Sequence, residues 1–236
     1  MNINKENTVA EVVSKKLGSD NVFSKYKIDF CCGGGMTLEA ACAENGVTFE
    51  ILKQEIEAIN SKITGDQNLN ELDITTLMEQ ATEEFHQYFY EVLSQIMPLA
   101  AKVSEVHGSH NIEVVEISKL MQAVEIVLIE MLKNKEVSLF PAIESVLELN
   151  NSSSDISIKQ IENIKKAIDK SEIAQHLVSD TFKEISKLSS HYKAPNDACN
   201  SYRFLYEKLH ELDHQLQKYM HFNTYVLIPK ILKIVA

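Results

Sequence analysis

Apolar residues recur every three or four positions along four long stretches of the chain, the spacing that places them on one face of an α-helix. These stretches cover residues 73–106, 111–137, 156–189 and 197–222. Polar loops containing asparagine, serine and proline separate them. Four long amphipathic helices are typical of a four-helix bundle, so each apolar stripe is expected to face the bundle axis.

Shorter helices are predicted before this bundle. Thr8, Thr37 and Thr48 each precede a helical pattern that a threonine side chain can cap. The three predicted helices end near Gly18, Glu44 and Lys62, and short helical pieces are predicted between the first two, through Lys27. Polar and turn-forming residues then interrupt the helical pattern, which indicates a domain boundary.

The predicted fold class is therefore all-α. A small helical domain at 1–62 is expected to be joined by a linker at 63–72 to a four-helix bundle at 73–236. Only 7 glycines and 4 prolines occur in 236 residues, which favours long uninterrupted helices.

Charge and cysteine content narrow the classes of function. The chain has 34 acidic and 23 basic residues, and its net charge of −11 argues against nucleic acid or an anionic membrane as a partner. No apolar run approaches the length of a membrane span, and the polar N-terminus does not resemble an export signal. The 4 cysteines have neither disulfide-framework nor zinc-site spacing, so reduced thiols and a cytoplasmic location are expected.

Two adjacent cysteines, Cys31 and Cys32, form the motif that points most clearly to chemistry. Three glycines follow them, and a helix is predicted to begin near Thr37. Glycines can adopt positive φ and leave the sulfurs reachable, while the amides at a helix N-terminus stabilise a thiolate. Reactive thiols are therefore predicted here, and the alternative is a pair of inert cysteines packed in a turn.

Three polar residues lie on or beside the inward stripes of the predicted bundle. His86 follows the first stripe, Lys135 belongs to the second, and His176 lies in the third helix beside apolar neighbours. A buried polar group is costly unless it is paired or bound to metal. A single histidine in such a place is more often an ordinary core residue than a ligand.

The segment Phe30–Gly35, together with Leu139–Pro141 and Leu227–Pro229 at the expected ends of two bundle helices, resembles the iron–sulfur cluster repair family, also called the repair-of-iron-centres group. The resemblance covers nearly the whole chain. It implies a small cysteine-bearing helical domain followed by a hemerythrin-like four-helix bundle that holds a non-haem di-iron centre. It also implies repair of clusters damaged by nitric oxide or oxidants, a stress response in which Cys31 and Cys32 would react.

The resemblance implies four histidine ligands and two bridging glutamates, with His-x-x-x-Glu before each of these two proline motifs. His86 matches the first-helix histidine and His176 the third-helix histidine. The remaining slots hold Met131, Lys135, Tyr219 and Asn223. The implied di-iron centre is therefore degenerate in this chain, and iron is expected to be absent or held differently.

Other candidate ligands lie close to these slots in the sequence, namely Glu130, Glu136, His214 and His221. Each successive residue turns about 100° around a helix, so these side chains are expected to point elsewhere.

Two further interpretations stay open. The chain could be a non-enzymatic interaction partner or a thiol-based sensor of nitric oxide or redox state. Alternatively, it could hold metal through a non-standard set drawn from His86, His176, Glu130, Glu136 and Tyr219. The partners that the resemblance implies are damaged iron–sulfur proteins, and a homodimer and a pair with an intact paralogue are both open.

Overall fold

The computed structural model describes residues 3–16, 18–30, 33–59, 69, 71–151 and 156–235, with backbone only at 150 and 151. Within these ranges the regular elements are all helical, and the single β-type contact is an isolated bridge between Thr8 and Thr37. The all-α fold class is confirmed.

The chain divides into two compact units. The first unit comprises residues 1–77 and 217–234, and the second comprises residues 78–216 together with Val235. The predicted linker at 63–72 lies mostly outside the described residues, so the predicted domain boundary stays a prediction.

Four short helices form the N-terminal part of the first unit. They are α1 (Val9–Lys15), α2 (Ser19–Lys25), α3 (Leu38–Asn45) and α4 (Phe49–Ala58). Thr8, Thr37 and Thr48 each accept a hydrogen bond from a backbone N–H of the helix that follows, so all three predicted caps are confirmed. Apolar side chains from each helix share one core, which includes Val12, Phe23, Leu38 and Leu52.

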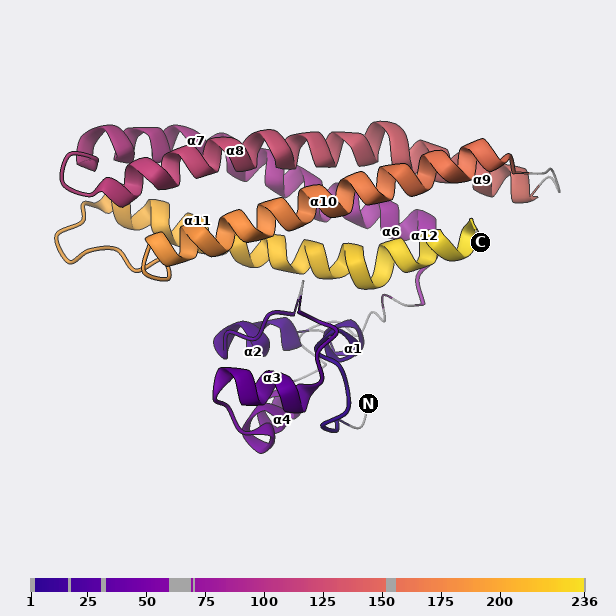
Figure 1. Cartoon of the computed structure of the whole chain (residues 1–236), viewed down its shortest axis with the longest axis horizontal. Coiled ribbons are helices and arrows are strands. Elements are labelled where there is room, and N and C mark those ends of the chain that lie inside the picture. The colour runs from indigo at the N-terminus through magenta and orange to yellow at the C-terminus, as the bar shows by residue number, and fades with distance from the viewer. Residues whose placement is uncertain are drawn as a thin grey trace. The chain divides into compact units, whose positions relative to one another are not determined.

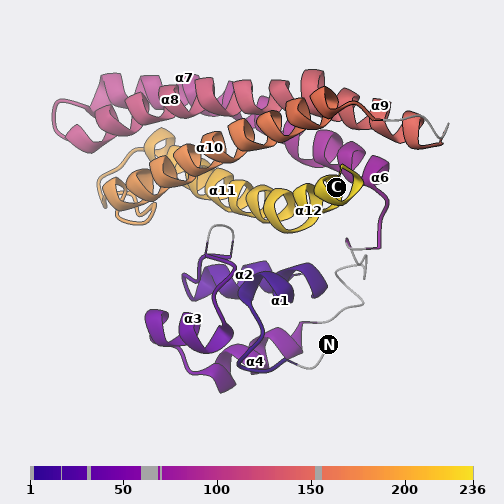
Figure 2. The same ribbon diagram turned by 45° about the vertical axis from the view of Figure 1, so that its right-hand side comes forward.

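The longer helices follow. They are α6 (Ile74–Gln80), α7 (Gln87–His107), α8 (Ile112–Asn134), α9 (Phe140–Asn151), α10 (Ile158–Leu188), α11 (Asn200–Phe222) and α12 (Ile228–Ile234). In the second unit α7, α8, α10 and most of α11 run as long neighbouring helices, the arrangement expected of a bundle (Figures 1 and 2).

Three π-helical segments interrupt the long helices. They are η1 (Ala81–His86), η2 (Lys135–Leu139) and η3 (Asn223–Leu227). Each begins or ends at a residue that the sequence placed in a ligand slot, namely His86, Lys135 or Asn223. Such segments are rare and occur often at functional sites, so they mark the same positions independently of the sequence motif.

The expectation that two helices end at Pro141 and Pro229 was wrong. Helix α9 continues to Asn151 and α12 to Ile234. Each proline is the second residue of the helix that follows a π segment.

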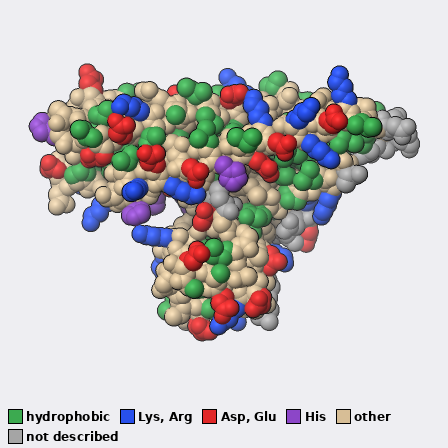
Figure 3. Space-filling view, in the orientation of Figure 1, with side chains coloured by type: hydrophobic (Ala, Val, Ile, Leu, Met, Phe, Trp, Pro, Cys, Tyr) green, Lys and Arg blue, Asp and Glu red, His purple; other side chains and the backbone are tan. Residues whose placement is uncertain are grey.

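Charged side chains of both signs are interspersed on the face shown in Figure 3. The face shown therefore carries no extended basic patch of the kind that binds nucleic acid, in agreement with the net charge of −11. In the part of the chain that the structure describes, no helix has both the length and the apolar character needed to cross a membrane.

Candidate functional site

Backbone hydrogen bonds hold the segment that follows the double cysteine. Cys31 and Cys32 lie outside the described residues, but the residues on both sides of them are described. The N–H groups of Val9 and Ala10, in the first turn of α1, donate to the carbonyls of Met36 at 3.0 Å and Gly34 at 2.8 Å. First-turn N–H groups have no partner within their own helix, so α1 is free to bind this segment.

The glycines after the double cysteine provide space rather than unusual backbone angles. Positive φ among the described glycines occurs at Gly18 and Gly46, so the three glycines that follow the double cysteine do not use the conformational freedom that glycine allows. A Cβ on Gly34 would lie 2.9 Å from the carbonyl oxygen of Phe30 and 2.9 Å from the hydroxyl of Tyr225. Gly34 is therefore needed for the close approach of η3.

His221 holds the other side of the double cysteine. This buried residue at the end of α11 places Nδ1 3.0 Å from the carbonyl oxygen of Phe30 and Nε2 3.1 Å from Oγ of Ser14 in α1. Burial lowers the pKa of His221, so the neutral ring donates from Nδ1 to the carbonyl and accepts at Nε2 from the serine hydroxyl. Sequence reasoning missed this role, because nothing in the pattern links α11 to residue 30.

An ion pair provides a second link within the first unit. Nζ of Lys218 lies 3.0 Å from a carboxylate oxygen of Asp20 in α2. The segment between α2 and α3 is thus bounded by α1 and by the last helices of the chain.

The other two cysteines have contrasting surroundings. Cys42 is buried in α3, and burial, with the Glu50 carboxylate as a smaller cause, raises the pKa of its thiol. Cys199 is exposed immediately before α11, with Sγ 3.2 Å from Nε2 of His107. Because thiolates are the reactive form, Cys42 is the less reactive of these two.

In the second unit, His86 is completely buried and paired with a carboxylate. Its Nδ1 lies 2.7 Å from Oε1 of Glu136, and the hydroxyl of Tyr90 lies 3.4 Å from both oxygens of that carboxylate. Burial, assisted by the Lys135 charge, lowers the pKa of His86 to about 3, whereas burial raises that of Glu136. A neutral imidazole therefore donates to the carboxylate.

The pairing of Glu136 with His86 corrects the expectation that Glu136 points elsewhere. Glu136 is the second residue of η2, where the π-helical turn changes the angular spacing of side chains. The expectation of about 100° for each residue does not hold there.

Lys135 is an unusual residue to find in a bundle interior. Its side chain is 0% exposed, and burial lowers the pKa of its amine to about 7, with the Glu172 carboxylate opposing the shift. A fully buried ammonium group is costly, so the amine loses its proton much more readily than an ordinary lysine. The inward position predicted for Lys135 is confirmed.

His176 does not lie where the sequence suggested. It is exposed on α10, as are its neighbours Ile173 and Leu177, while Gln175 is buried. The inward orientation expected for His176 was therefore wrong. The apolar residues that flank it belong to an exposed part of the helix, and apolar neighbours alone did not fix the buried face.

Comparisons with known proteins found a family model and several relatives. Residues 5–60 match the family model ScdA_N, described as "Domain of Unknown function (DUF542)". The iron–sulfur cluster repair protein ScdA of Staphylococcus haemolyticus is 27% identical over 234 residues, which cover 97% of this chain and 99% of the relative. The probable iron–sulfur cluster repair protein of Haemophilus influenzae is 25% identical over 217 residues, or 91% and 92% of the two chains.

The iron–sulfur cluster repair protein YtfE of Yersinia pestis is 23% identical over 212 residues, which cover 90% of both chains. The similarity thus extends through both units. This chain is similar to the iron–sulfur cluster repair proteins over nearly its whole length.

The residues of this chain do not fit the di-iron centre that the resemblance implies. Met131, Lys135, Tyr219 and Asn223 stand at the four positions that the resemblance assigns to ligands. All four are buried, and none of them carries a carboxylate or an imidazole. The Lys135 side chain cannot bridge two metal ions as a carboxylate does, and in its protonated form it repels a divalent cation. Among the described residues, no group of three or more His, Cys, Asp and Glu side chains is placed to hold a metal ion.

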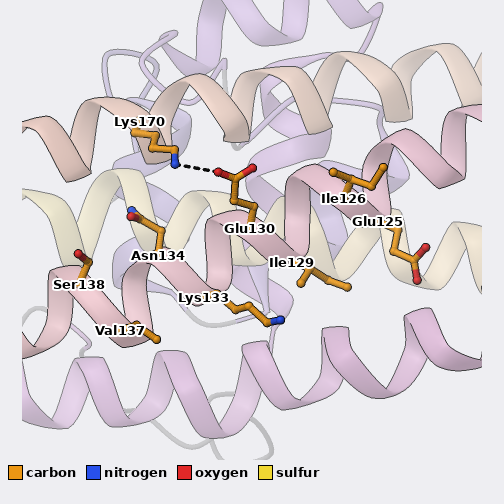
Figure 4. Close-up of a pocket in the computed structure, with 9 residues that line it drawn as sticks. All are labelled: Glu125, Ile126, Ile129, Glu130, Lys133, Asn134, Val137, Ser138 and Lys170. Carbon is orange, nitrogen blue, oxygen red and sulfur yellow. Dashed lines mark hydrogen bonds and ion pairs between the residues drawn. The ribbon is translucent and has the colours of Figure 1, made fainter.

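Glu130 faces outward, as predicted. It forms an ion pair of 2.8 Å with Lys170 beside a surface groove of about 680 Å³, to which the exposed Ile126 and Val137 also contribute (Figure 4). This location removes Glu130 from the non-standard metal set considered above.

Proposed function

We propose that this chain acts in the repair of damaged iron–sulfur clusters through the thiols of Cys31 and Cys32. The relatives named as cluster repair proteins match it over nearly its whole length. The observation that carries the proposal is the anchoring of both flanks of the double cysteine. His221 binds the carbonyl before it, while Ala10 binds the Gly34 carbonyl after it.

We further propose that the bundle works without the ordinary di-iron centre. The support is Lys135, whose amine is buried and whose position is the one that the resemblance assigns to a bridging glutamate. The second unit then serves as a helical scaffold, and the chemistry of the chain lies in the first unit. Damaged iron–sulfur proteins are the proposed clients, in the cytoplasm under nitrosative or oxidative stress.

A test of the thiol proposal is the relative reactivity of the four sulfurs. At least one of Cys31 and Cys32 is expected to react with an alkylating reagent faster than Cys42 and Cys199. Cys42 should be slowest, because burial removes access and raises its thiol pKa. Competitive alkylation across a pH range, followed by peptide mass analysis, ranks all four in one experiment.

Cys199 is the appropriate comparison in this experiment, because it is exposed and has an imidazole at 3.2 Å. Labelling of Cys31 and Cys32 no faster than Cys42 would show that the pair is structural. The non-enzymatic interaction protein would then replace the proposal.

A further inference from the structure

Each ring nitrogen of His221 contacts a different part of the N-terminal segment. Nδ1 lies 3.0 Å from the carbonyl oxygen of Phe30, the residue immediately before Cys31. Nε2 lies 3.1 Å from the Ser14 hydroxyl in α1. The neutral imidazole is well suited to this place, because it offers one donor and one acceptor on opposite sides of a rigid ring.

The two flanks of the double cysteine have different anchors. The carbonyl of Phe30, on the Cys31 side, is bound by His221. On the Cys32 side, the carbonyl of Gly33 accepts from the Met36 N–H at 3.0 Å. The first anchor depends on a side chain nearly 200 residues away in the sequence, whereas the second is local.

We infer that His221 is a positioning residue for the double cysteine, acting on Cys31 more strongly than on Cys32 through its hydrogen bond to the Phe30 carbonyl. The inference rests on the proposed function, because it concerns the same pair of thiols. It assigns a role to the end of α11 that the double-cysteine motif does not contain.

The contacts around His221 support a positioning role. Tyr225, one turn further on, has its ring centroid 5.1 Å from that of His221 and its hydroxyl against Gly34. The ion pair between Lys218 and Asp20 lies one turn before. His221 thus lies between these two contacts at the C-terminal end of α11. Its orientation is fixed by packing as well as by hydrogen bonds.

Substitutions at His221 can separate its two bonds. Asparagine places an amide N–H near the position of Nδ1, so His221→Asn retains a donor for Phe30. Glutamine reaches towards the position of Nε2, so His221→Gln retains a partner for Ser14 and loses the bond to Phe30. His221→Leu removes both bonds, and Ser14→Ala removes only the bond at Nε2.

The readout is the ratio of the alkylation rate constants of Cys31 and Cys32 in the full chain. His221→Leu and His221→Gln are expected to change this ratio by about threefold or more, the scale of one lost hydrogen bond. His221→Asn and Ser14→Ala should leave it within about twofold of the wild-type ratio. His210→Leu is a matched control, because His210 is an exposed histidine of the same helix.

A purely structural role for His221 predicts a different pattern. All His221 variants would then lower the melting temperature without changing the ratio, and Asn would behave like Gln and Leu. That outcome would overturn the inference. Because His221→Asn keeps a polar group in place, it remains informative if His221→Leu fails to fold.

Failure of this inference is distinguishable from failure of the proposed function. If the wild-type double cysteine labels no faster than Cys42, the thiol proposal fails, whatever the ratio does. If the double cysteine labels fast but the ratio of the Cys31 and Cys32 rate constants is the same in His221→Leu and His221→Gln as in the wild type, only the positioning role fails.

Discussion

Replacing Lys135 with methionine is expected to raise the free energy of unfolding at pH 7 by up to about 4 kcal/mol. In the folded chain burial lowers the pKa of this amine from its ordinary value of 10.5 to about 7. At pH 7 the Lys135 amine is therefore almost fully protonated in the unfolded chain and only about half protonated in the folded chain. This difference in protonation disfavours folding. Methionine fills a similar volume without a charge to bury.

The pH dependence of this effect has a definite sign. Between pH 7 and 10.5 the unfolded state binds more protons at Lys135 than the folded state, so wild-type stability rises with pH across this window. Below pH 7 both states become protonated and the full cost remains. The advantage of Lys135→Met should therefore be largest at or below pH 7 and fall to roughly 1 kcal/mol or less near pH 10.

Urea unfolding of both proteins at several pH values measures this difference. Lys133→Met is the matched control, because Lys133 is an exposed lysine near the end of α8. It should change stability by no more than about 0.5 kcal/mol. A destabilised Lys135→Met protein would indicate that the amine forms interactions that outweigh its burial.

Restoring the four substituted slots together is expected to create iron binding. The changes are Met131→His, Lys135→Glu, Tyr219→His and Asn223→Glu. They replace a thioether, an ammonium, a phenol and an amide with the imidazoles and carboxylates that iron requires. Lys135→Glu alone should bind little, because a di-iron site needs its bridging and terminal ligands at once.

The structure adds one change to this design. Gln175 is buried on α10 whereas His176 is exposed, so Gln175→His adds a third-helix imidazole at a buried position. The five-fold variant is expected to bind iron more tightly than the four-fold variant, as measured by elemental analysis after dialysis. If both variants stay helical and bind none, the interior has been remodelled beyond the substituted side chains.

Much of the architecture could be predicted from the sequence, because local signals agreed with the global pattern. Thr8, Thr37 and Thr48 each cap the helix expected to follow, and the stripe on α11 from Leu205 to Leu216 is buried throughout. Lys135 lies inside, as its place on an apolar stripe indicated. These features depend on spacing along a regular helix, which a sequence displays directly.

The errors arose where helical spacing changes or where distant segments meet. The π-helical turn at η2 brought Glu136 to His86, against the expectation from regular spacing. On α10 the apolar residues beside His176 proved to be exposed. The bond between His221 and Phe30 joins residues far apart in the chain, and no periodicity encodes such a contact.

Iron content is the measurement that tests the central claim most directly. The account predicts that protein purified without oxygen contains well below one iron per chain and lacks the visible absorption of an oxo-bridged di-iron centre. The reason is that the buried Lys135 stands at the position that the resemblance assigns to a bridging glutamate. Two irons per chain with that absorption would contradict it.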